Sequence, residues 1–195
     1  MRPQLYLASR SPRRQELLRQ VGLAFEIGAA DVPERRDPGQ APADYALEMA
    51  LAKARAVGPR ALPVLGADTD VVLDDDILGK PIDGNQALDM LRRLAGRTHE
   101  VYSGVAVVNG KRVERALSVT EVTFGPISAA DAQAYWDTGE PADKAGAYAI
   151  QGYGARFVKE IRGSYSGVVG LPLYETLELL ARFGVHPGPP AKDPA

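Results

Sequence analysis

Residues 65–81 read LGADTDVVLDDDILGKP, and the expected fold is arranged around this stretch. Its apolar residues predict a strand in which Asp68 and Asp70 share one face. Two carboxylates so spaced would lie about 6.6 Å apart and repel by about 2.5 kcal/mol at an effective dielectric near 20. Water, a cation or a lysine must relieve that repulsion, and Lys80 follows nearby. We expect half of an oxygen-ligand metal site or, alternatively, an exposed strand edge with a solvated turn at 74–76.

The composition limits the classes of function that the protein can have. The 195 residues are 45% hydrophobic and 25% charged, which is ordinary for one sizeable globular domain or two small lobes. A net charge of −2 argues against a large basic surface for a nucleic acid polymer. No apolar run approaches the length of a membrane span, and the apolar residues at 5–8 are too few for a signal peptide. We therefore expect a cytoplasmic protein with no membrane partner.

The chain has no cysteine and only two histidines, which excludes several kinds of chemistry. Disulfides, thiol nucleophiles and zinc–thiolate sites are impossible, and a histidine-rich zinc site is excluded. Any metal must then be held by carboxylates, which favours Mg²⁺ or Mn²⁺. With no cysteine nucleophile and so few histidines, direct attack by water is the simplest hydrolytic mechanism.

A basic loop follows the first predicted strand. Residues 4–8 form that strand, and the loop SRSPRR at 9–14 leads into a helix over 15–21. Ser11 is a suitable N-cap and Pro12 a suitable first helical residue. Hydroxyls and arginines beside free helical N–H groups predict a phosphate-binding cradle. The alternative is a solvated basic helix start.

The remaining pattern is mixed α/β, and no Walker A or G-x-G-x-x-G motif occurs, so function must come from dispersed loops. The dipeptide Asn109-Gly110 predicts a two-residue hairpin turn. The Pro-rich tail at 187–195 is predicted to be disordered. Periodicity and turn residues predict helices over 43–57, 85–94, 128–137 and 173–183, and strands over 24–27, 101–108, 111–124, 147–150 and 155–161.

Five segments, in order along the chain, together resemble the Maf family. They are LASRSPRRQELL (7–18), GADTDVVLDDDILGKP (66–81), GRTHEVYSGVAV (96–107), GEPADKAGAYAIQG (139–152) and GSYSGVVGLPLYET (163–176). The resemblance implies an α/β fold with a long mixed sheet and two lobes around a cleft, as in inosine triphosphatase-like proteins. It also implies a single Maf-like domain over 1–186 and a homodimer.

The resemblance further implies a nucleoside triphosphate pyrophosphatase. Such an enzyme uses a divalent metal, Mg²⁺ or Mn²⁺, to cut between the α- and β-phosphates, which releases a nucleoside monophosphate and pyrophosphate. The family's substrate-selecting positions fall on Arg13, Thr69 and Gln151, a combination similar to the subgroup acting on dTTP and UTP. The expected role is removal of non-standard nucleotides.

The family pattern assigns the remaining site residues by position. Asp68 is implied as the general base, and with Glu34 as a metal ligand. Asp70 departs from the family, which more often has an apolar residue there. Because Asp68 and Thr69 would point to opposite faces of an ideal strand, we predict a bend or strand end after Gly66. The positions implied to bind phosphate are Ser9, Arg14, Lys53 and Lys80.

Two other functions remain open at this point. The first is a nucleotide-binding regulator of cell division or septum formation, which would act through a partner without fast turnover. The second is the same hydrolysis applied to a purine or methylated purine triphosphate.

Overall fold

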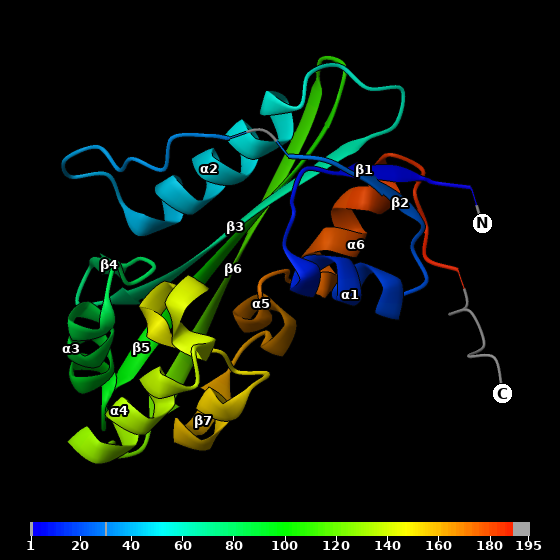
Figure 1. The fold of residues 1–195 in the computed structure, drawn as a ribbon. Helices are drawn as coiled ribbons and strands as arrows, with labels where there is room; N and C mark the ends of the chain where they lie inside the picture. Colours follow the sequence, from blue (N-terminus) through cyan, green and yellow to red (C-terminus); the bar gives the residue numbers. More distant parts are fainter. Residues whose placement is uncertain (1, 30, 189–195) are drawn as a thin grey trace, which may run out of the picture.

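The computed structural model describes residues 2–29 and 31–188. These form a mixed seven-stranded sheet in the order β2-β1-β3-β5-β6-β7, with β4 also paired to β3 (Figure 1). The strands are β1 (Leu5–Leu7), β2 (Phe25–Ile27), β3 (Val64–Leu73), β4 (Asp76–Leu78), β5 (Thr98–Asn109), β6 (Arg112–Phe124) and β7 (Val158–Arg162).

The α-helices flank this sheet, and three short 3-10 helices lie between α4 and β7. No helix of the described residues is long and apolar enough to cross a bilayer. The α-helices are α1 (Pro12–Gln20), α2 (Pro42–Ala56), α3 (Gly84–Leu94), α4 (Ala129–Asp137), α5 (Tyr165–Val169) and α6 (Leu173–Arg182). The 3-10 helices are η1 (Glu140–Asp143), η2 (Ala145–Ala147) and η3 (Tyr153–Phe157).

Three long antiparallel strands, β3, β5 and β6, form the spine of the molecule (Figure 1). At the start of β3, strand β1 pairs with it in parallel at Val64 and Leu65. At the other end, β4 pairs with it from Val71 onward. Within the described chain, residues 66–70 of β3 pair with β5 alone, so the edge of β3 is open between the two lobes.

Helix α2 lies on one face of the spine because small residues allow it to approach. Ala46 and Ala50 of α2 are fully buried. A Cβ atom on Gly66 would lie 2.2 Å from the Ala50 carbonyl oxygen, and one on Gly104 would lie 2.4 Å from that of Ala46. Larger side chains at either glycine would push α2 off the sheet, so both glycines are required by packing.

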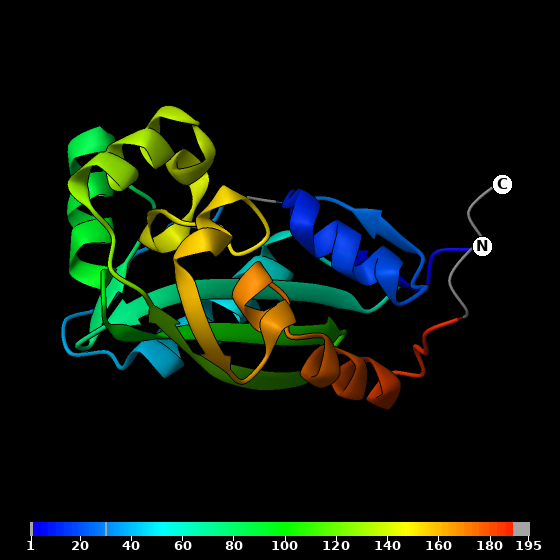
Figure 2. The same ribbon diagram turned by 90° about the horizontal axis from the view of Figure 1, so that it is seen from below.

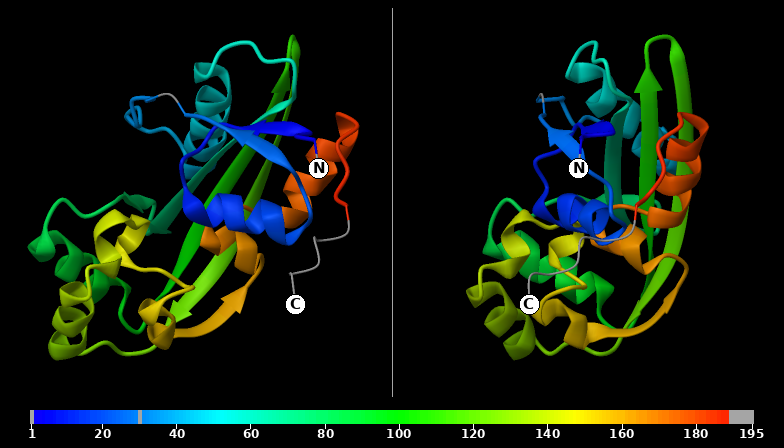
Figure 3. Two further views of the ribbon diagram at one scale, coloured as in Figure 1. Left: turned by 45° about the vertical axis from the view of Figure 1, so that its right-hand side comes forward. Right: turned by 90° about the vertical axis from the view of Figure 1, so that its right-hand side faces the viewer.

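Helix α5 lies on the opposite face. Ser103 is the neighbour of Gly104 in β5, so its side chain points away from α2. Its hydroxyl donates a 2.7 Å hydrogen bond to the Gly167 carbonyl oxygen of α5. The views in Figures 2 and 3 show the sheet with helices on both sides.

The second lobe consists of β4, α3, α4 and the 3-10 segments. Helix α3 was predicted to turn Ala87, Leu88, Leu91 and Leu94 inward; Ala87, Leu91 and Leu94 are buried, Leu88 is only partly buried, and Met90 is buried as well. Ser128 caps α4 by accepting a hydrogen bond from the Asp131 amide at 3.0 Å. The first lobe consists of β1, β2 and α1, on the other side of the open edge (Figure 1).

Several predicted elements are wrong in detail. The predicted strand at 147–150 is absent because Ala147 has a positive φ of 58° and the Ala149 amide bonds to a side chain. The segment predicted as a strand from Ala155 begins as η3, and β7 starts only at Val158. The hairpin turn is shifted by one residue, since Asn109 pairs with Arg112 and Gly110 takes the left-handed conformation. Strand β4 and helix α5 were not predicted.

Two further predictions concern the turn after β3 and the C-terminal tail. Residues 74–76 are exposed, as the solvated interpretation requires, although the turn itself is 74–75 and Asp76 begins β4. Asp74 and Asp76 pair with Arg97 and Arg93. The predicted disorder of the tail concerns mainly residues 189–195, which lie outside the described residues.

Candidate active site

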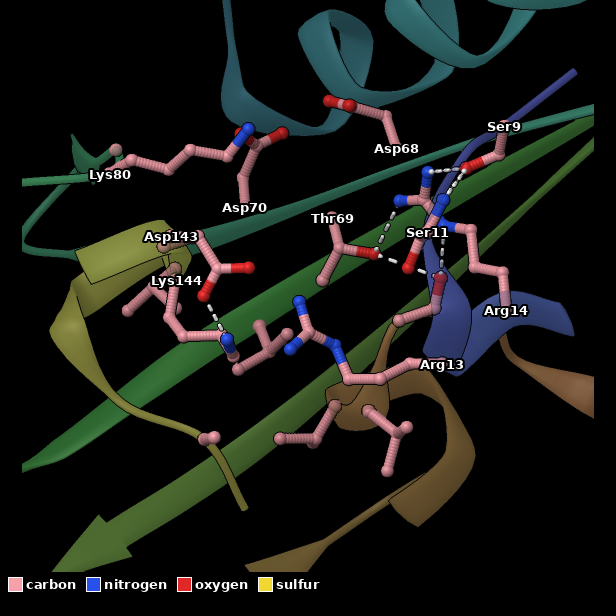
Figure 4. A pocket seen from close by; sticks show the side chains of 18 of the residues that line it. Ser9, Ser11, Arg13, Arg14, Asp68, Thr69, Asp70, Lys80, Asp143 and Lys144 are labelled. Carbon is pink, nitrogen blue, oxygen red and sulfur yellow. Dashed lines mark hydrogen bonds and ion pairs between the residues drawn. The ribbon is translucent and has the colours of Figure 1, made fainter. Parts of the chain in front are cut away.

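A cleft of about 530 Å³ opens at the free edge of β3, between the two lobes (Figure 4). It is lined by α1 and the loop before it, by α2, by β3 and by the segment around η2. All the residues predicted as site residues from the sequence line this one cleft: Ser9, Arg13, Arg14, Glu34, Lys53, Asp68, Thr69, Lys80 and Gln151.

The centre of the cleft is an ion-paired triad. Lys53 Nζ of α2 lies 2.5 Å from Asp68 Oδ1 and 2.6 Å from Glu34 Oε1. Burial alone would lower the pKa of Lys53, but the two carboxylates outweigh burial and raise it. The hydrogen bond from Lys53 likewise overcomes burial and lowers the pKa of Glu34. The ammonium therefore stays charged between two acids.

The bend predicted in β3 is wrong. The strand runs without interruption from Val64 to Leu73, with Asp68 opposite Gly104 and Thr69 opposite Ser103 in the β5 register. Asp68 points to the α2 face and Thr69 to the α5 face. Both line the cleft because the cleft opens on the unpaired edge of β3, where side chains from either face can reach it.

Thr69 belongs to a polar cluster on the α5 face. Arg14 Nη2 lies 3.5 Å from Thr69 Oγ1, and Arg14 Nη1 lies 3.3 Å from Ser9 Oγ. Arg14 Nε donates a 2.8 Å hydrogen bond to the Gly170 carbonyl oxygen. Burial lowers the pKa of Arg14, against the opposing charge of Asp68. Among the described residues no ion pair to Arg14 is formed, so its charge faces the cleft without a carboxylate on it.

The start of α1 corresponds to the predicted cradle in position but differs in its capping. Ser11 is the N-cap residue and Pro12 begins the helix, yet the Ser11 side chain makes no capping hydrogen bond. Instead the Ser11 amide donates to Ser9 Oγ at 3.2 Å. Two serines and two arginines thus gather at one wall of the cleft (Figure 4), an arrangement suited to an anion.

Asp70 is a second buried carboxylate beside Asp68, as strand alternation predicted. It is 8% exposed, and its Oδ2 atom has no hydrogen-bond partner among the described residues. Burial and then the charge of Asp68 raise the pKa of Asp70 well above its usual range. The lysine that contacts this acidic pair is Lys53; Lys80 is exposed at the cleft rim.

Asp68 and Asp70 suit a divalent cation whose remaining ligands come from the phosphates of a bound molecule and from water. Among the described residues no three His, Asp or Glu side chains are grouped closely enough to hold a metal. Asp68 and Asp70 nevertheless offer oxygen donors on one face, and one Asp70 oxygen is buried and unpartnered. Mg²⁺ is commonly held by one or two carboxylates, with substrate phosphates and water completing its shell. Glu34, the other predicted ligand, is bonded to Lys53.

The far wall of the cleft is the segment from Asp143 to Gln151. Arg13 extends from α1 toward Asp143 and Lys144, which are bonded to each other (Figure 4). Gln151 lies on the loop between η2 and η3, and its side chain makes no hydrogen bond with any other described residue. Arg13 and Gln151 thus lie on opposite walls of the cleft.

The sequence did not point to Tyr45 or Tyr148, which also line the cleft. Burial and then Asp70 raise the pKa of Tyr45 to about 12. The Tyr148 hydroxyl lies 2.8 Å from Nε2 of the buried His99, behind the cleft wall. A tyrosine in an apolar run gives no sequence signal of its own, although His99 in RTHEVYSG could have prompted a search for a buried partner.

Solved structures share this architecture at low identity. The Staphylococcus aureus Ham1 protein superposes with a TM-score of 0.51 at 12% identity, over 92% of this chain and 96% of that one. The match confirms an α/β fold of the inosine triphosphatase-like kind, with a mixed sheet and helices.

The fold and the charged cleft thus define an α/β protein with a candidate anion site at the open edge of its sheet. A family model described as Maf-like protein matches residues 4–183. The chain therefore belongs to the Maf family, which confirms the resemblance seen in its motifs.

Curated relatives are named for their activity. A protein named dTTP/UTP pyrophosphatase in Saccharophagus degradans is 51% identical over 187 residues, covering 93% of this chain and 89% of the relative. Proteins of the same name from Salmonella typhimurium and Xanthomonas axonopodis pv. citri are 52% and 50% identical. The Salmonella match covers 92% of this chain and 92% of the relative. The Xanthomonas match covers 93% of this chain and 100% of the relative.

Proposed function

We propose that the protein is a dTTP/UTP pyrophosphatase that cuts between the α- and β-phosphates and releases a nucleoside monophosphate and pyrophosphate. The observation that carries the proposal is the Lys53–Asp68 pair in a cleft that also holds Arg14, which has no carboxylate partner among the described residues. Relatives about half identical over nearly their whole length bear that name, which supports the same substrate class here.

In the proposed reaction Asp68 acts as the general base. Its Oδ1 accepts a hydrogen bond from Lys53, which orients the carboxylate that takes a proton from an attacking water. Glu34 accepts a second hydrogen bond from the same ammonium, which helps to keep Lys53 beside Asp68. Asp68 then removes the water proton as the water attacks phosphorus.

Phosphate binding is assigned to the cations around the cleft. Arg14, fixed by Ser9 and the Gly170 carbonyl, would bind phosphate oxygens as a charged donor with a set direction. Lys80 and Lys53 would neutralise further charge, which is the main requirement of phosphoryl transfer.

A divalent cation, Mg²⁺ or Mn²⁺, would be held by Asp68 together with substrate phosphate oxygens, and Glu34 is its other proposed ligand. When bound, such a cation supplies charge neutralisation and polarises the phosphoryl oxygens. The donor set is hard and carboxylate-rich, which suits these ions.

Base selection is assigned to Arg13, Thr69 and Gln151. Gln151 offers both a hydrogen-bond donor and an acceptor, which the edge of a pyrimidine base requires. We propose further that the protein acts as a cytoplasmic homodimer built from a single domain over 1–186, and that its role is removal of non-standard nucleotides.

A nucleotide panel tests the proposal. Purified protein is incubated with Mg²⁺ or Mn²⁺ and each of dTTP, UTP, CTP, dATP and GTP, and pyrophosphate release is measured. The expected result is fastest release from dTTP and UTP. Absence of turnover with every pyrimidine triphosphate would refute the activity, and faster release from GTP would favour the purine alternative. A regulatory role in cell division has no specific observation in its favour.

A further inference from the structure

Gln151 lies on a loop whose backbone amides donate hydrogen bonds to one buried tyrosine and one carboxylate, neither of which lines the cleft. The loop is defined as residues 149–154, which run from the turn after η2 into the first two residues of η3. Neither Tyr135 of α4 nor Glu140 of η1 lines the cleft, whereas Gln151 does. Their hydrogen bonds go to this loop rather than to the cleft itself.

Hydrogen bonds to Tyr135 and Glu140 fix backbone amides on both sides of Gln151. The Ala149 amide donates to the Tyr135 hydroxyl oxygen at 3.0 Å, and that hydroxyl donates to Glu140 Oε1 at 2.6 Å. The Tyr153 amide donates to Glu140 Oε2 at 2.8 Å, and the Gly154 amide donates to Glu140 Oε1 at 3.0 Å. The loop is thus fixed at three amides by a single tyrosine–carboxylate pair.

Two glycines show how closely the pair fits the loop. A Cβ atom on Gly152 would lie 2.1 Å from Glu140 Oε2, and one on Gly154 would lie 2.4 Å from the Tyr135 hydroxyl. Neither contact leaves room for a side chain, so the backbone itself lies against the carboxylate and the phenol. Tyr135 is fully buried, which fixes the direction of its hydroxyl.

The charge state agrees with this arrangement. Burial would raise the pKa of Glu140, but its hydrogen bonds from Tyr135 and from the Gly154 and Tyr153 amides outweigh burial and lower that pKa. An ionised carboxylate accepts from three donors at once, which a neutral amide of the same shape cannot reproduce.

We infer that Glu140 and Tyr135 are positioning residues that hold the loop 149–154 so that Gln151 meets the edge of the nucleobase. The inference rests on the proposed function and deepens it, because it makes base discrimination depend on a pair outside the cleft. The ligand class is a nucleoside triphosphate with a pyrimidine base. The end of the cleft assigned to the triphosphate is formed by α1, α2 and β3, which the hydrogen bonds of this pair do not reach.

The test uses Glu140→Gln and Tyr135→Phe in the full chain, with Glu160→Gln on exposed β7 as a matched control. Hydrogen exchange of the 149–154 amides measures the loop without any nucleotide. Binding of non-hydrolysable α,β-methylene analogues of UTP and GTP measures discrimination without turnover. For the turnover itself, KM and kcat for UTP are determined for each variant.

We expect faster amide exchange in both variants and an affinity ratio of UTP to GTP analogue that falls about tenfold, as loss of a charged hydrogen bond implies. The KM for UTP rises by a similar factor while kcat stays within about twofold. Glu160→Gln changes none of these, and Tyr135→Phe keeps the matched shape if the Gln variant is unstable.

Unchanged amide exchange in folded variants would overturn the positioning role. Faster exchange with an unchanged affinity ratio, or an equal loss for both analogues, would overturn the role in base discrimination. A wild type that binds the analogues with discrimination but releases no pyrophosphate would contradict the proposed function alone, since the variants can still be compared by binding.

Discussion

Lys53 Nζ lies 2.5 Å from Asp68 Oδ1, and this pair joins α2 to the unpaired edge of β3. The contact depends on α2 lying close to the sheet, which Gly66 permits by having no side chain. It also relieves the repulsion between Asp68 and the neighbouring Asp70. One helix–strand packing thus sets both the geometry of the proposed base and the local charge balance.

Replacing the proposed base tests the assignment of Asp68. Asp68→Asn keeps the shape but cannot accept a proton from water, so we expect kcat for dTTP to fall by about 100-fold or more. Asp75→Asn is the control, because Asp75 lies in the exposed turn at the end of β3 and asparagine tolerates its positive φ. Equal rates for the two variants would remove Asp68 from the chemistry.

Removing the ammonium tests how the acidic groups are held together. Lys53→Met leaves Asp68 and Glu34 without their shared partner in a partly buried place. We expect the free energy of unfolding, measured by urea titration at pH 7, to fall by about 3 kcal/mol, as for loss of one member of a buried pair. Lys159→Met, on exposed β7, should change it little; if both variants are equally stable, the pair contributes nothing to folding.

Asp70 should destabilise the fold as the pH rises. Burial and Asp68 raise its folded pKa, so the folded protein keeps a proton that the unfolded chain releases above its ordinary pKa of about 3.9. Stability is therefore lost as the pH rises from about 4 toward the folded pKa. We expect Asp70→Asn to be more stable than the wild type, with a gain that widens between pH 4 and pH 7 in urea titrations. A gain that is constant with pH, or a loss, would contradict this.

His99 should make the fold sensitive to acid. Burial lowers its pKa from 6.5 to about 4, so the folded state favours the neutral ring. The associated stability is present above pH 6.5 and is lost as the pH falls to 4, by about 3 kcal/mol. His99→Gln should flatten this part of the pH profile, whereas His186→Gln, at an exposed position, should not. Parallel profiles for both variants would exclude His99 as the cause.

Local patterns in the sequence predicted much of the fold. Helical periodicity located α2, α3 and α6 to within two residues, because each has a continuous buried stripe. The segment from Ala145 to Phe157 was mispredicted because its backbone amides bond to Tyr135 and Glu140, whose positions depend on tertiary structure. No local preference for strand or helix contains that information.

The sequence indicated which residues line the cleft but not how they are arranged. The motifs singled out Arg14, Lys53 and Asp68 by their match to a family pattern, and the structure places all three in one cleft. The bend predicted after Gly66 was wrong, since the sequence does not reveal that β1 leaves β3 at Leu65 and opens its edge. The partner of Asp68 is likewise set by the packing of α2 rather than by distance along the chain.

The most direct test of the proposed function is identification of the products by ³¹P NMR. The wild type and Asp68→Asn are each incubated with dTTP and Mg²⁺, and the phosphorus signals are followed with time. We predict that the wild type converts dTTP to dTMP and pyrophosphate with no dTDP, and that the variant does so far more slowly. Formation of dTDP and orthophosphate, or unchanged dTTP in the wild-type sample, would contradict the central claim.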